Sequence, residues 1–70
     1  MNLYEALPYL EQIVNEEKNP MLILEIMEAL TFMRDIRVLE IFKKLSDHEY
    51  PIVRLKAKSI LREIYNFHID

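Results

Sequence analysis

Hydrophobic residues recur along this chain at intervals of three and four, which is the spacing of one face of an α-helix. The pattern predicts four helices, over about 3–17, 20–33, 36–45 and 51–66. Asn19 and Asp35 stand where the second and third helices need an N-cap, and Pro20 and Pro51 suit a first helical position. The second helix is apolar on almost every side, which is typical of a helix in the middle of a structure.

The pattern occurs twice, because Pro20 and Pro51, 31 residues apart, open two similar apolar segments. The same offset aligns Leu30 with Leu61, and we expect both to be core positions. Ala57 is small enough to mark a close contact between helices. A fixed offset of this length is typical of helix pairs that stack as repeats.

These repeats predict an all-α fold and a single domain over residues 1–70. We expect four helices in an α-solenoid fragment, with two antiparallel helical hairpins stacked right-handedly. Repeat one would cover about 3–33 and repeat two about 35–66. Pro8 indicates that the first helix starts near Leu7, or that it starts earlier and is kinked there.

Composition supports a helical protein, because the chain has no glycine for tight turns and 51% of its residues are hydrophobic. It also has no cysteine, so it has no disulfide and no thiolate ligand. The first residues carry no basic segment, and the longest apolar run is too short to span a bilayer. We therefore expect a cytoplasmic protein with no membrane partner.

Residues 29–64 carry a family resemblance. They contain Ala-Leu at 29–30, Asp-x-Arg at 35–37, an aspartate in the turn, and Val-Arg at 53–54 followed by an alanine. This spelling resembles the short-period HEAT-like helical repeat of the phycobilisome-lyase type, and the first half of the chain is similar to a degenerate copy. Members of this class serve as binding scaffolds or adaptors, while a few are enzymes or bind nucleic acid. The resemblance therefore implies a fold and leaves several functions open.

The same resemblance implies a structural polar pair, Asp47 in the turn and Arg54 on the last helix. We expect Asp47 to cap that helix or its preceding turn through backbone N–H groups. Repeat one departs from the pattern, since Glu16 stands in place of the turn aspartate and Ile23 in place of the arginine.

The residues do not suggest an enzyme, and we expect no catalytic group, metal or cofactor. One enzymatic branch of the HEAT-like class binds iron through histidine–glutamate pairs, and this chain has one such pair, His48-Glu49. It falls in the turn before Pro51 and has no second pair facing it, whereas a metal site needs three or more converging ligands. A solvated turn histidine is the simpler interpretation.

Charge is divided unevenly along the chain, whose net charge is −3. Residues 1–33 hold six acidic and one basic side chain, giving −5, while residues 34–70 hold eight basic and six acidic, giving +2. On the last helix Arg54, Lys58 and Arg62 form a basic stripe that could bind nucleic acid weakly, although the acidic total argues against it. Alternatively, the stripe marks a solvent-facing terminal repeat.

The leading hypothesis is a protein-interaction or adaptor module that binds another protein or itself. Two repeats are fewer than the usual minimum, so some apolar surface should stay uncovered. The candidate partner-binding residues are Leu3, Leu7 and Leu10 on the first helix, with Leu24, Leu55, Lys58 and Arg62. We expect a homo-oligomer, with a two-fold dimer favoured and the basic stripe outside its interface. The alternative is a small nucleic-acid-binding protein that uses the stripe.

Overall fold

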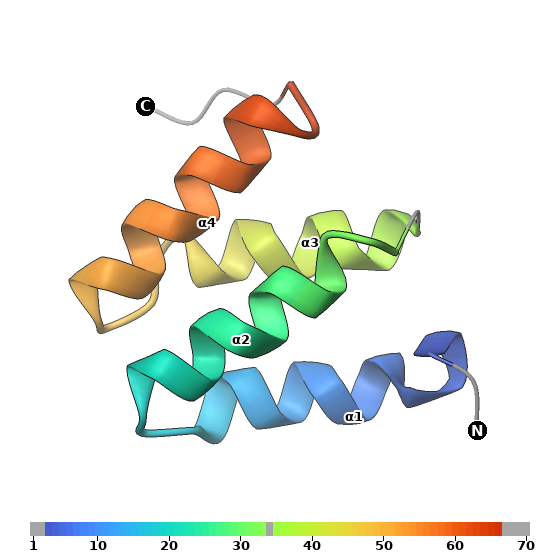
Figure 1. Cartoon of the computed structure of the whole chain (residues 1–70), viewed down its shortest axis with the longest axis horizontal. Helices are drawn as coiled ribbons and strands as arrows, with labels where there is room; N and C mark the ends of the chain where they lie inside the picture. The colour runs from blue at the N-terminus through green and yellow to red at the C-terminus, as the bar shows by residue number, and fades with distance from the viewer. Residues whose placement is uncertain (1–2, 34, 67–70) are drawn as a thin grey trace.

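The computed structural model describes residues 3–33 and 35–66, and four helices follow one another along them (Figure 1). Their bounds are α1 Leu3–Glu16, α2 Pro20–Leu30, α3 Ile36–Leu45 and α4 Pro51–Glu63. No strand occurs in this part of the chain, which confirms the all-α prediction. The third helix has the predicted bounds, whereas α2 and α4 each end three residues earlier than predicted.

The helices begin where the sequence places their signals. The Asn19 side chain accepts the Met21 N–H at 3.0 Å, and the Asp35 carboxylate accepts the Arg37 N–H at 2.9 Å. Each bond satisfies one of the N–H groups that a first helical turn leaves open. Pro20 and Pro51 occupy the predicted first positions, where a missing N–H costs nothing.

Pro8 lies inside α1, because that helix begins at Leu3. Of the two sequence interpretations, the structure therefore has the helix that starts before the proline. A proline at this position has no N–H to donate to the carbonyl four residues earlier, so α1 lacks one of its internal hydrogen bonds.

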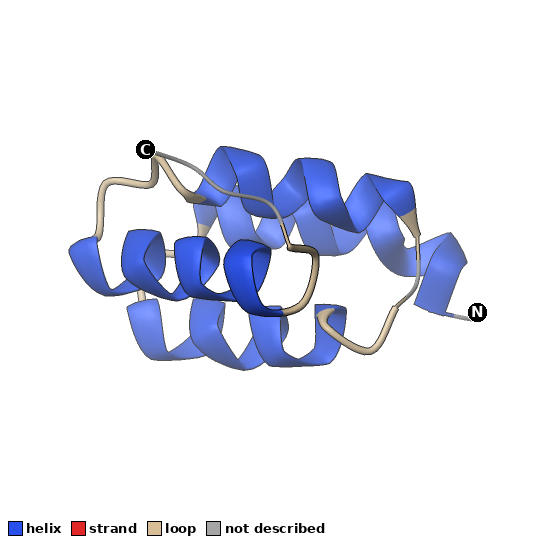
Figure 2. Cartoon of the chain, turned by 90° about the horizontal axis from the view of Figure 1, so that it is seen from above, coloured by secondary structure: helices blue, strands red, loops and turns tan. Residues whose placement is uncertain are grey.

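The helices pair as two hairpins, α1 with α2 and α3 with α4. Between the hairpins α1 contacts α3 and α2 contacts α4. Seen from above, α2 and α4 form one layer and α1 and α3 form the other (Figure 2). The molecule measures 36 × 27 × 15 Å, and this small thickness is that of two helical layers.

The core lies between these layers. Leu30, Ala57 and Leu61 are fully buried in it, as predicted from the repeat. The buried side chains come from all four helices and are Leu7, Val14, Ile23, Met27, Leu30, Met33, Val38, Ile41, Phe42, Leu45, Val53, Ala57, Ile60 and Leu61.

Two expectations about uncovered surface are wrong. Leu7 is buried and Leu10 is partly buried against the core, because α1 turns this face toward α2 and α3. The predicted apolar patch on the first helix therefore lacks these two residues, and the side chain of Leu3 lies outside the described residues. Leu24 also packs against the core, whereas Leu55 is 69% exposed as predicted.

The second helix is less enclosed than its composition predicts. Ile23, Met27 and Leu30 are buried, but Met21 is 60% exposed and Ala29 also faces solvent. The main contacts of this helix are with α1 and α4, and the side that carries Glu25 and Ala29 is exposed.

Candidate interaction surface

The turn between α3 and α4 carries the polar residues for which the sequence suggested a repeat-specific role. Asp47 is exposed, and Tyr50, the N-cap residue of α4, has no side-chain capping hydrogen bond. The prediction that Asp47 caps this helix is therefore wrong. Instead, the Tyr50 N–H donates to Nδ1 of His48 at 3.1 Å, which gives the turn a histidine acceptor in place of the aspartate.

Arg54 is engaged in the same turn and does not reach Asp47. Its Nη1 donates to the carbonyl of His48 at 2.9 Å and to that of Glu49 at 3.1 Å. These carbonyls precede α4 and would otherwise need water, so the guanidinium satisfies them and ties the turn to the helix. The proposed polar pair of Asp47 and Arg54 is thus replaced by an arginine bound to backbone.

The basic stripe is consequently shorter than the sequence indicated. Arg54 is half-buried and bound to the turn, which leaves Lys58, also half-buried, and Arg62, which is exposed. Neither Lys58 nor Arg62 pairs with an acidic side chain of residues 3–33 or 35–66. Two free cations make a small positive area at one end of the molecule.

His48 and Glu49 border a hollow of about 380 Å³ where the two hairpin turns meet. The opposite wall is formed by the end of α1 and the following turn, residues 15–18. Within the described ranges no three histidine, cysteine, aspartate or glutamate side chains are close enough to hold a metal ion. The His48 ring lies 5.1 Å from that of Tyr50 and accepts a backbone N–H, so its contacts are those of a structural turn residue.

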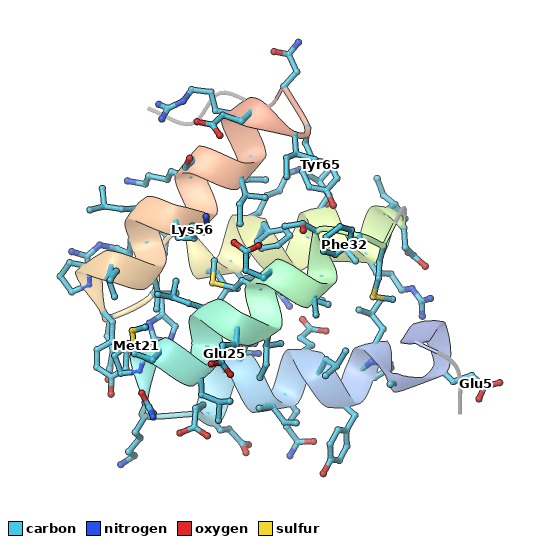
Figure 3. The ribbon with its side chains drawn as sticks, viewed as in Figure 1. Glu5, Met21, Glu25, Phe32, Lys56 and Tyr65 are labelled. Atoms are coloured by element: carbon cyan, nitrogen blue, oxygen red, sulfur yellow. The ribbon has the colours of Figure 1, made fainter. Side chains whose placement is uncertain are left out.

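Several large apolar side chains are exposed at the surface. Figure 3 labels Met21 at the start of α2 and Phe32 just after its end. Phe32 is 81% exposed and Ile52, on α4, is 49% exposed. Sequence reasoning missed Phe32 because it counted this residue among the apolar positions of a second helix that was expected to be enclosed on almost every side.

A shallow, almost wholly apolar hollow of about 270 Å³ lies between the start of α3 and the segment that follows α4. Its walls are Asp35, Ile36, Leu39 and Tyr65. The Tyr65 ring lies 6.2 Å from that of the buried Phe42, so the segment after α4 partly covers α3 (Figure 3). Ile36 remains 71% exposed at the rim.

The start of α3 carries the most strongly shifted ionisable group. The Asp35 carboxylate accepts hydrogen bonds from the Arg37 side chain, with Oδ2 to Nη2 at 2.7 Å, and from the Arg37 backbone N–H. The side-chain bonds first, and then the backbone bond, lower the pKa of Asp35 from 3.8 to about 2. This cluster explains the start of α3 and is not a ligand site by itself.

Two further findings bear on the class of protein. No helix in the described part of the chain is long and apolar enough to cross a membrane. Comparison with models of known protein families, with curated proteins and with solved structures finds no match to this chain. Function must therefore be argued from the surface.

Proposed function

We propose that this chain is a non-enzymatic protein-interaction module. The observation that supports this most directly is the set of large apolar side chains left exposed on α2, on α4 and in the turn after α2, including Met21, Leu55 and Phe32. A large exposed apolar area on a small domain is typical of a protein–protein contact. Burying such a surface is favourable by about 25 cal/mol per Å² before the costs of association.

We further propose that the two hairpins are HEAT-like repeats and that the chain is a short α-solenoid. Equivalent positions 31 residues apart start both α2 and α4 with proline and bury Leu30 and Leu61 alike. Repeats of this type present their partners with the faces that no neighbouring repeat covers. The same proposal covers self-association, including the dimer expected from the sequence.

The test is affinity capture from a lysate combined with sedimentation velocity of the purified chain. The matched bait is the double variant Met21→Lys and Leu55→Lys, both at exposed positions, so that its fold should be unchanged by circular dichroism. A partner, or a second copy, that binds the natural chain and is lost with the variant supports the proposal. Binding that is equal for the two baits would contradict it.

Nucleic-acid binding is the alternative function. The case for it is weaker because Arg54 is bound to the turn carbonyls and so is removed from the basic stripe. A stripe reduced to Lys58 and Arg62 could neutralise about two phosphates, which gives weak and salt-sensitive binding. Retention on heparin at moderate salt, lost in Lys58→Glu with Arg62→Glu, would favour this alternative. We expect the chain to elute at low salt with or without these substitutions.

A further inference from the structure

The contact between α2 and α4 within one chain shows which faces of these helices fit together. Nζ of Lys56 on α4 lies 3.2 Å from Oε1 of Glu28 on α2. Figure 3 shows Lys56 directed toward α2, with Glu25 on the side of α2 away from it. Residues three and four apart share a side of a helix, so Leu24 and Thr31 flank Glu28, and α4 meets them with the side that carries Lys56.

The α4 side of this contact is the side of Lys56, which Val53 and Ile60 share because they lie three and four residues from it. Both apolar members are buried. Subtracting 31 from each number gives the equivalent positions on α2, which are Leu22, Glu25 and Ala29. We call these three residues the lower face. It has the same order of an apolar, a charged and an apolar residue, but here Leu22 is 38% exposed and Ala29 is exposed too.

The α2 side of the contact has its own equivalents at the other end of the molecule. Adding 31 to Leu24, Glu28 and Thr31 gives Leu55, Ser59 and Arg62 on α4, and Lys58 is equivalent to the buried Met27. We call these four α4 residues the upper face. Leu24 packs against the core while Leu55 does not, because no further helix lies above α4 among the described residues.

The charges on the two faces are opposite. The side chain of Glu25 on the lower face has no hydrogen bond or ion pair with residues 3–33 or 35–66. The same holds for the side chains of Lys58 and Arg62 on the upper face. The sequence extends this complementarity, since its first 33 residues carry −5 and the remainder +2. Two faces that are equivalent to an internal contact and carry opposite charge suit contact between two copies.

We propose that a second copy of this chain stacks head to tail on the first, with its lower face on the upper face of its neighbour. The inference rests on the proposed function and gives its occupant. Leu55 of one copy lies against Leu22 and Ala29 of the next, as Leu24 packs within the chain. Glu25 of the second copy then lies near Ser59 and Arg62, where Lys56 meets Glu28 inside each chain.

Such a contact is heterologous, because it joins two different surfaces. Each copy keeps one free face after pairing, so assembly continues beyond a dimer unless the stack closes into a ring. A two-fold dimer would instead join one surface to itself. The two arrangements can therefore be told apart by stoichiometry and by how variants behave in mixtures.

The experiment uses two variants of the full chain, each with one blocked face. Ala29→Arg places a cation on the lower face, where it would meet Lys58 and Arg62, and Leu55→Arg places a cation on the upper face. The two blocked faces therefore repel each other as well. Gln12→Arg and Ile36→Arg are the matched controls, because they make the same kind of change at exposed positions outside both faces. Circular dichroism melts establish that all four variants remain folded.

Sedimentation velocity over a range of concentrations then gives the result. We expect the natural chain to form species larger than a dimer. Each blocked variant should associate at least about tenfold more weakly, whereas the controls should associate like the natural chain. An equimolar mixture of the two blocked variants should form a one-to-one dimer, because each supplies the face that the other has kept.

Four results would overturn the head-to-tail contact. They are a natural chain that stays monomeric at about 1 mM, natural association that stops at a dimer, association that the blocked variants leave unchanged, and a mixture that fails to pair. In the second and third cases the chain still binds itself, so the proposed function stands and only this geometry fails. Affinity capture that depends on Met21 and Leu55 would likewise preserve the proposed function if the chain is monomeric.

Discussion

The two hairpins align with each other at an offset of 31 residues but have unequal surroundings, and the difference is clearest between α2 and α4. Both helices start with proline and bury a leucine at the aligned position. However, α4 buries Val53, whereas the equivalent Leu22 is 38% exposed. Each helix packs against the other helix of its own hairpin, and α2 and α4 also pack against each other. The side of α4 that carries Val53 faces α2, whereas the aligned side of α2, which carries Leu22, faces away from α4. Burial therefore follows position in the stack as well as residue type.

The largest loss of stability should come from substitutions at the buried leucine that occupies the aligned position in both hairpins. Leu30→Ala and Leu61→Ala should each destabilise the fold by about 2–5 kcal/mol, because both side chains are fully buried. Urea denaturation followed by circular dichroism measures the loss, with the exposed Leu55→Ala as the control. A neutral Leu30→Ala would mean that the alignment of the two repeats is wrong.

A second prediction separates the hairpins by adding volume. Ala57 is fully buried, and Ala57→Leu should cost about 1–3 kcal/mol through overpacking. The same change at the exposed Ala29 should alter stability by no more than about 0.5 kcal/mol. Thermal melts of the two variants give the comparison. Equal losses would show that the lower face is already covered, which would contradict its description as free.

The starts of α2 and α4 provide a third contrast. Asn19→Ala should cost about 0.5–2 kcal/mol, because it removes the bond to the Met21 N–H. Asp47→Ala should change stability by no more than about 0.5 kcal/mol, since α4 has no side-chain cap. Denaturation midpoints of both variants test the difference. A costly Asp47→Ala would restore the role that the family resemblance implied for this aspartate.

A fourth prediction concerns pH and the start of α3. The pKa of Asp35 is lowered from 3.8 to about 2, so its carboxylate stabilises the folded state above pH 3.8. This contribution is lost as the pH falls toward 2. Asp35→Asn keeps an acceptor oxygen but does not titrate, so its melting temperature should fall less than that of the natural chain between about pH 5 and pH 2.

The neutral cap of α2 is the matched control for this experiment. Asn19→Asp introduces a titrating carboxylate at a helix start and should add acid sensitivity of the same sign. If Asp35→Asn and the natural chain lose stability in parallel on acidification, the hydrogen bonds from Arg37 do not hold this pKa low.

The smallest effect should come from the ion pair between the hairpins. Glu28 and Lys56 are 60% and 41% exposed, and such pairs contribute about 0.2–1 kcal/mol. A double-mutant cycle with Glu28→Gln and Lys56→Gln isolates the coupling and should show it falling with added salt. A coupling near zero would weaken the use of this pair as the guide to how two copies meet.

Structural features that depend on residues close together in the sequence were predictable, whereas those that depend on packing between helices were not. The caps at Asn19 and Asp35 need only an N–H two residues ahead, so local sequence was sufficient. The burial of Leu7 depends on contacts with other helices, and periodicity could not show that its side would be covered. The Asp47 prediction failed because it came from a resemblance, whereas His48 and Arg54 satisfy the turn in this chain.

The histidine–arginine turn also has a consequence for the folding pathway. Arg54 and His48 are only six residues apart, so closing this turn costs little chain entropy. The α3–α4 hairpin is then a natural folding nucleus, with α1 joining afterwards. In stopped-flow refolding, Leu61→Ala should mainly slow folding, whereas Leu7→Ala should mainly accelerate unfolding. The reverse pattern would place the nucleus in the first hairpin.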